Sequence, residues 1–166
     1  MRKPSGADQK KRKGLIIVNT GEGKGKSTAA FGLAMRAAGN KMNVFILQFM
    51  KGQWKAGERN SFEKLAPYVE VVPMGDGFTW DTENIEQDKA TARKAFDIVK
   101  EKLNSGKYNM VIFEEINYVL HYKFLPEDEV LEVIKNKPEM THVVCTGRNA
   151  SEKLIEMADL VTEMKM

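Results

Sequence analysis

The chain has very little cysteine and histidine. Its 166 residues include one cysteine, Cys145, and two histidines, His121 and His142. A single cysteine excludes a disulfide within the chain, and such usage is typical of proteins of the reducing cytoplasm. Because Cys145 ends an apolar run, we interpret it as a packed core residue rather than a nucleophile. The isolated histidines exclude a histidine–cysteine metal site of the usual spacing.

Long apolar runs are also lacking. No segment approaches the roughly 20 apolar residues that a membrane-spanning helix needs. The charged N-terminus is not followed by an apolar segment before the first expected strand, so we expect no signal peptide. These absences favour a cytoplasmic protein that does not bind a membrane.

The chain carries little net charge, and that charge is unevenly distributed. The formal net charge is +3, whereas residues 1–13 alone carry six cations and one anion, or +5. Residues 14–166 therefore sum to −2, and a near-neutral body disfavours a nucleic-acid partner. We interpret residues 1–13 as a flexible basic arm, either solvated or folded over a bound anion. We interpret residues 14–166 as a single nucleotide-binding α/β domain.

Short apolar runs alternate with helical segments across residues 14–166. Strands are expected at 14–19, 43–49, 69–72, 108–113, 141–146 and 160–163. Helices are expected at 27–38, near 62–65, and at 85–104, 126–136 and 151–158. This alternation predicts a three-layer α/β/α fold with a mostly parallel sheet. Ligands of such sheets bind at the carboxyl ends of the strands, where Gln48, Glu114 and Thr146 are expected.

The stretch between the first expected strand and helix has the character of a phosphate-binding loop. Residues 20–28 read Thr-Gly-Glu-Gly-Lys-Gly-Lys-Ser-Thr. Glycines let backbone N–H groups converge on an anion, and the start of the helix adds the positive end of its dipole. Lys26 is expected to reach the outer phosphates and Ser27 to ligate magnesium. The spacing differs by one residue from G-x-x-x-x-G-K-[ST], so an ordinary glycine turn with a surface lysine is the alternative.

Charged residues follow two other expected strands. Glu114 and Glu115 come after four apolar residues, and in phosphate-loop proteins such a strand carries the magnesium-associated carboxylate. Either glutamate can hold the metal, through water or directly; a solvated pair at a helix start is the alternative. Arg148 follows Thr146-Gly147 and is either a phosphate clamp or a surface arginine. The ATP-binding residues that we predict are Gly21, Glu22, Gly23, Lys24, Gly25, Lys26, Ser27, Thr28 and Arg148.

Two large aromatic residues, Phe78 and Trp80, lie in a glycine-containing loop rather than on a periodic core face. Aromatic residues in such loops often line sites for planar ligands. The alternative is that they pin the loop onto the core. Their spacing alone leaves both interpretations open.

Several separate motifs, in order, resemble those of the ATP:corrinoid adenosyltransferases that act on cob(I)alamin and cobyrinic acid diamide. The similarity runs from about residue 14 to residue 163. The matching motifs are residues 20–30, residues 48–54 followed by 57–60, residues 74–80, Glu115 with Tyr118 after it, and Thr146-Gly147-Arg148 followed by Ala158-Asp159.

The resemblance implies a phosphate-loop NTPase-like (RecA-like) fold and a specific reaction. A cobalt(I) corrinoid attacks the ribose 5′-carbon of ATP, an adenosyl–cobalt bond forms, and triphosphate leaves. Lys26, the loop amides and magnesium held by Ser27 and Glu115 would then neutralise the charge of the leaving group. No protein nucleophile is required, which fits the absence of a catalytic triad.

The resemblance also implies the remaining site residues and partners. Phe78 and Trp80 would line the corrin face, disfavour the lower axial ligand and so assist reduction to cobalt(I). The catalytic residues would be Lys26, Phe78, Trp80 and Glu115. The implied partners are ATP, cobalamin or cobyrinic acid a,c-diamide, an electron-donating flavoprotein and a second copy of the chain. The reaction would serve adenosylcobalamin synthesis or salvage.

The chain departs from the family pattern at three places. Ser27 stands where threonine is usual, and Glu114 stands where aspartate is usual. The family usually continues past position 163 with a tail that contains Lys-His and ends in Gly-Ile, and we expect the phosphate machinery to be intact without it. The alternative functions are a phosphate-loop ATPase or small-molecule kinase, which needs an arginine-rich lid or a base near the γ-phosphate, and a nucleotide-gated binding module.

Overall fold

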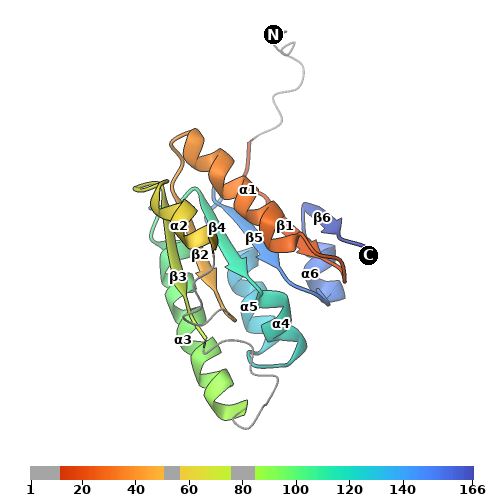
Figure 1. The fold of residues 1–166 in the computed structure, drawn as a ribbon. Helices are drawn as coiled ribbons and strands as arrows, with labels where there is room; N and C mark the ends of the chain where they lie inside the picture. Colours follow the sequence, from red (N-terminus) through yellow and green to blue (C-terminus); the bar gives the residue numbers. More distant parts are fainter. Residues whose placement is uncertain (1–11, 51–56, 76–84) are drawn as a thin grey trace.

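The sheet of this protein is built from parallel strands. A computed structural model describes residues 12–50, 57–75 and 85–166, and within them six strands form one sheet in the order β3-β2-β4-β5-β1-β6 (Figure 1). Every neighbouring pair of these strands is parallel. The strands are β1 (Ile16–Thr20), β2 (Val44–Gln48), β3 (Val69–Pro73), β4 (Met110–Glu114), β5 (His142–Thr146) and β6 (Leu160–Glu163).

Helices cover both faces of the sheet (Figure 1). The helices in the described part of the chain are α1 (Lys26–Gly39), α2 (Gly57–Glu63), α3 (Ile85–Asn104), α4 (Ile116–His121), α5 (Glu127–Lys135) and α6 (Glu152–Met157). Buried side chains of α1 and α2 pack on one face, and those of α3, α4, α5 and α6 pack on the other. The predicted three-layer α/β/α fold is therefore confirmed. Within the described residues, no helix has the length and apolar character needed to span a membrane.

Alanine lets α1 lie close against the sheet. Ala30, Ala34, Ala37 and Ala38 recur at helical spacing and are buried against strand residues such as Ile46. Small side chains bring the helix backbone near the strands. Because β1 leads through a short loop into α1, the start of this helix lies at the carboxyl edge of the sheet.

Most expected elements are present within one or two residues of their predicted bounds, and α3 has the predicted bounds. Cys145 is fully buried, as predicted, and burial raises the pKa of its thiol to about 12. The sequence did not predict α4. The helix has only six residues, so its apolar pattern is too short to distinguish a helix from a loop. It follows Glu115, which has a left-handed φ of 66°.

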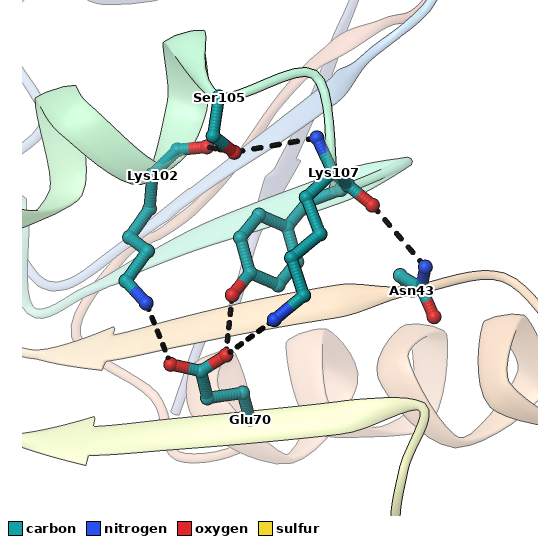
Figure 2. Close-up of polar contacts among 6 residues, drawn as sticks. Asn43, Glu70, Lys102, Ser105 and Lys107 are labelled. Atoms are coloured by element: carbon teal, nitrogen blue, oxygen red, sulfur yellow. Dashed lines mark hydrogen bonds and ion pairs between the residues drawn. The ribbon is translucent and has the colours of Figure 1, made fainter.

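At the amino edge of the sheet, Glu70 of β3 accepts hydrogen bonds from three side chains (Figure 2). Lys102 Nζ lies 2.8 Å from Oε1, Lys107 Nζ lies 3.4 Å from Oε2, and the Tyr108 hydroxyl also donates to Oε2. Burial alone would raise the pKa of Glu70, but the hydrogen bonds and the charge of Lys102 outweigh it and lower the pKa to about 2. The cluster ties the edge strand to the end of α3.

Candidate nucleotide site

At the carboxyl end of each of four neighbouring strands, a buried polar side chain lies on the face of the sheet that α1 covers. The four residues are Asn19, Gln48, Glu114 and Thr146, whose exposed fractions are 3%, 0%, 0% and 0%. Gln48 is in register with Glu114, and Asn19 is in register with Thr146. Two residues earlier on each strand, the same face presents an apolar side chain to the core under α1. The carboxyl edge of this face is therefore polar, and we call these four residues the polar row.

The phosphate loop packs against the chain that follows β6. Met164 N donates to the Thr20 carbonyl (2.8 Å), and Gly23 N donates to the Met164 carbonyl (2.7 Å). A Cβ at Gly21 would lie 2.4 Å from the Met164 oxygen, and a Cβ at Gly23 would lie 2.5 Å from the Lys165 oxygen. These two glycines are therefore required by the close passage of residues 164 and 165, in addition to any phosphate that the loop binds.

The loop turns into α1 at Gly25, which has a φ of 110°. This left-handed conformation favours glycine. The next residue, Lys26, is 8% exposed, and its ammonium donates to the carbonyl oxygens of Gly21 (2.7 Å) and Gly23 (2.5 Å). The Asn19 side chain in turn donates to the Lys26 carbonyl (3.3 Å). The lysine ammonium is thus held inside the loop, at the start of the helix.

Ser27 connects the loop to β4. Its hydroxyl donates a 2.8 Å hydrogen bond to Oε1 of Glu114. Glu115 leaves the strand in a left-handed conformation, and its backbone N–H donates to Thr146 Oγ1 (3.0 Å). The structure thus brings Glu114 into contact with Ser27.

A cleft of about 340 Å³ opens beside the loop and the start of α1. Its lining residues come from the loop, from α1, from the turn after β4, from α4 and from the turn after β5: Gly23, Lys24, Gly25, Lys26, Ser27, Thr28, Glu115, Tyr118 and Arg148. Most of the predicted ATP-binding residues therefore converge on one cleft, together with Glu115. Tyr118 also lines the cleft, although the sequence pointed to it only as part of a motif that matches the family. Its side chain is half-buried, and burial, together with the neighbouring Tyr122, raises the pKa of its phenol.

Two predicted ATP-binding residues do not line the cleft. The carbonyl oxygen of Gly21 accepts a hydrogen bond from the Lys26 ammonium. Glu22 lies at the rim, with a carboxylate oxygen 3.4 Å from Arg148 Nη1, and both side chains are 59% exposed. Such an exposed ion pair contributes about 0–1 kcal/mol. Phe78 and Trp80, the predicted corrinoid-binding residues, lie outside the described residues.

The side-chain groups that could hold a metal ion at this site are oxygen donors. The Ser27 hydroxyl donates to the buried Glu114 carboxylate, and Glu115 lines the cleft together with Ser27. Nowhere in the described part of the chain, this cleft included, do three His, Cys, Asp or Glu side chains gather as a metal cage. Hard oxygen donors in small number suit Mg²⁺, which is usually bound by one or two carboxylates together with the phosphates of a substrate. The assignment of Ser27 and Glu115 as metal ligands stays a prediction.

Asn19 is a site residue that the sequence interpretation missed. It ends β1 immediately before the loop and was read only as the end of a buried strand. The signal was available, because Ile17 and Asn19 are two residues apart and therefore lie on the same face of the strand. An apolar residue followed two positions later by a polar one, at the carboxyl end of a buried strand, marks each member of the polar row.

Comparison with known proteins gives consistent matches over most of the chain. The family described as "ATP:corrinoid adenosyltransferase BtuR/CobO/CobP" matches residues 12–166. A corrinoid adenosyltransferase of Sinorhizobium sp is 48% identical over 156 residues, which cover 93% of this chain and 73% of the relative. A corrinoid adenosyltransferase of Escherichia coli (strain K12) is 42% identical over 159 residues, or 96% of this chain and 80% of the relative. Corrinoid adenosyltransferase CobA of Salmonella typhimurium (strain LT2) is 40% identical over the same lengths and shares.

Proposed function

Because the chain belongs to the ATP:corrinoid adenosyltransferase family, we propose that it transfers the 5′-deoxyadenosyl group of ATP to the cobalt of a reduced corrinoid. The observation that carries this proposal is the phosphate loop joined to β4 through Ser27 and Glu114, in a chain that matches the family over residues 12–166. The corrinoid is a substrate of the reaction, as is ATP.

The chemistry requires a leaving group rather than a protein nucleophile. The electron pair of cobalt(I) forms a bond to the ribose 5′-carbon, the carbon–oxygen bond breaks, and its electrons leave with triphosphate. Cobalt is oxidised from cobalt(I) to cobalt(III). The protein accelerates this step by stabilising the negative charge that develops on the departing oxygen.

Lys26 and the start of α1 provide that stabilisation. The ammonium is already held inside the loop by the carbonyls of Gly21 and Gly23, so it exchanges these oxygens for those of the triphosphate. The N–H groups of the first turn of α1 and its dipole favour an anion at the same place. Arg148 is a second cation at the rim, and releasing it from its exposed pair with Glu22 costs about 0–1 kcal/mol.

We further propose that magnesium accompanies the triphosphate. The Ser27 hydroxyl and the carboxylate of Glu114 or Glu115 fit the hard oxygen ligands that this ion prefers. When bound, the ion would neutralise charge on the triphosphate. Ser27 and its carboxylate partner would orient the triphosphate against the loop.

The identity of the corrinoid and the other partners belong to the same proposal. The candidate corrinoids are cobalamin and cobyrinic acid a,c-diamide, bound with the help of Phe78 and Trp80. An electron-donating flavoprotein would supply the cobalt(I) state, and the protein would act as a homodimer in the cytoplasm. These points rest on the resemblance of the sequence motifs.

An anaerobic assay tests the proposed reaction. The protein is mixed with ATP, Mg²⁺ and chemically reduced cobalamin, and the visible spectrum is recorded. We expect light-sensitive adenosylcobalamin and one triphosphate for each adenosyl group transferred. Release of ADP and phosphate without a change in the corrinoid spectrum would instead support an ATPase and would refute adenosyl transfer.

A further inference from the structure

Gln48 is the member of the polar row whose side chain has no hydrogen-bond partner within the described part of the chain. Both its Nε2 and its Oε1 are buried and unpaired among the described residues, and the residue has an exposed fraction of 0%. The other three members each make a hydrogen bond: Asn19 with the Lys26 carbonyl, Glu114 with Ser27, and Thr146 with the backbone of Glu115. A fully buried amide without a partner is uncommon and requires an explanation.

The unpaired carboxamide is unfavourable for folding of the free protein. Burying an amide without a hydrogen bond is costly, whereas an apolar side chain of similar shape would avoid that cost. Two residues earlier on the same face, Ile46 is such an apolar side chain. The backbone does not explain the choice of glutamine, because the Gln48 carbonyl is already paired with Met74 N (2.8 Å). A polar group that is retained against stability points to a role in function.

The position of Gln48 indicates what it binds. It lies in register with Glu114 on the adjacent strand, and neighbouring strands are about 4.8 Å apart. Glu114 in turn contacts the Ser27 hydroxyl, so the carboxamide lies beside the proposed cation site without being one of its direct ligands. A second carboxylate at this position would repel Glu114, whereas a neutral amide places an acceptor oxygen there without adding charge.

We propose that Gln48 is a positioning residue of the nucleotide site, whose Oε1 accepts a hydrogen bond from a water molecule on the triphosphate-bound divalent cation. Mg²⁺ keeps several of its waters when it binds phosphates, and those waters need acceptors. Gln48 and Glu114 would share this role from neighbouring strands. The inference rests on the proposed function, because Mg²⁺–ATP is the ligand that it requires.

The variant Gln48→Met, made in the full chain, tests the proposal without measuring catalysis. Three quantities are measured: the thermal midpoint of the free protein, the affinity for ATP with saturating Mg²⁺, and the affinity for ATP with EDTA. We expect the midpoint to rise by about 3 °C, because an unpaired buried amide is replaced by an apolar side chain. We expect the affinity in Mg²⁺ to fall about 10-fold, the usual effect of removing an outer-sphere partner of a metal, and the affinity in EDTA to be unchanged.

Thr141→Val is the matched control. Thr141 is also a buried polar residue next to a strand, but it precedes β5 at the amino edge of the sheet. Its hydroxyl donates to the Tyr108 carbonyl (3.1 Å). Its replacement should lower the midpoint and leave both affinities at the wild-type value. The two variants therefore separate loss of a structural hydrogen bond from loss of a ligand contact.

Three results would overturn the assignment of Gln48. A lower midpoint, or failure to fold, would mean that the amide has a structural partner. Unchanged affinity in Mg²⁺ would mean that it takes no part in binding. Equal losses in Mg²⁺ and in EDTA would mean that it contacts the triphosphate and not the hydrated cation. If wild-type protein binds Mg²⁺–ATP but transfers no adenosyl group, the proposed function fails and the Gln48 assignment is still decided by these affinities.

Discussion

The hydroxyl of Ser27 donates a 2.8 Å hydrogen bond to the fully buried carboxylate of Glu114. The two residues are 87 positions apart in the chain, so this contact holds the phosphate loop against the central strand β4. Removing the donor of a buried hydrogen bond leaves the acceptor unpaired, at a cost in stability. The contact therefore connects the stability of the fold to the geometry of the candidate nucleotide site.

Removing this hydroxyl should weaken both folding and nucleotide binding. We expect Ser27→Ala to lower the free energy of unfolding by about 2 kcal/mol, measured by urea denaturation. It should also weaken Mg²⁺–ATP binding by about 10-fold or more, measured by calorimetry. Ser27→Thr keeps the hydroxyl and should behave as wild type in both measurements. Wild-type affinity in the alanine variant would contradict the role of Ser27.

Lys26→Ala should abolish most of the adenosyl transfer. Removing one charge-stabilising donor typically lowers kcat by about 100- to 1000-fold, and Lys26 is the cation held inside the loop. The rate is measured from the formation of adenosylcobalamin under anaerobic conditions. Lys94→Ala removes the same charge from an exposed position on α3 and is the control. A Lys26→Ala rate close to that of Lys94→Ala would rule out the assigned role.

Gly147→Ala should disturb the turn that carries Arg148. Gly147 has a φ of 129°, and a Cβ there would lie 3.0 Å from Asn117 Cβ and 3.1 Å from a carboxylate oxygen of Glu115. We expect a loss of about 1–3 kcal/mol in the free energy of unfolding from backbone strain alone. Gly32→Ala, in the interior of α1, meets no atom within 4 Å and should instead gain up to about 1 kcal/mol. Chemical denaturation should therefore show a lower free energy of unfolding for Gly147→Ala and a higher one for Gly32→Ala than for wild type.

The Glu70 cluster should make stability depend on pH in acid (Figure 2). The pKa of the Glu70 carboxyl group is lowered from 4.5 to about 2, so the folded state favours the carboxylate. The stabilisation is therefore complete above pH 4.5 and is lost as the pH falls towards 2. Because the side chain is 37% exposed, we expect a contribution of only about 1 kcal/mol.

Glu70→Gln tests this dependence. Urea denaturation between pH 5 and pH 2 should show a smaller loss of stability in the variant than in wild type, because the titrating group is absent. Glu101→Gln, at an exposed position on α3, should keep the wild-type dependence. Parallel curves for all three proteins would show that the cluster around Glu70 does not contribute.

Local patterns in the sequence were sufficient to predict most of the secondary structure, and they also led to the proposal of a phosphate loop. Alternating apolar runs marked the strands, and the loop was recognised from Gly25, Lys26 and Ser27 together with its position between a strand and a helix. The helix α4 was missed, because six residues hold too little periodicity. The close passage of residues 164 and 165 against the loop was also beyond any local pattern, because it depends on the pairing of β6 with β1.

The sequence by itself determined the class of fold and the family, and it predicted the phosphate-binding chemistry, because each depends on residue types at short spacing. Tertiary structure alone decided which side chains meet. The order of the strands places β4 and β2 side by side, and the pleat directs Glu114 and Gln48 to the face under α1. Glu115, one residue later, leaves the strand and lines the cleft from the turn. Two adjacent glutamates that look equivalent in the sequence thus occupy different places, because register and strand order arise from packing between distant segments.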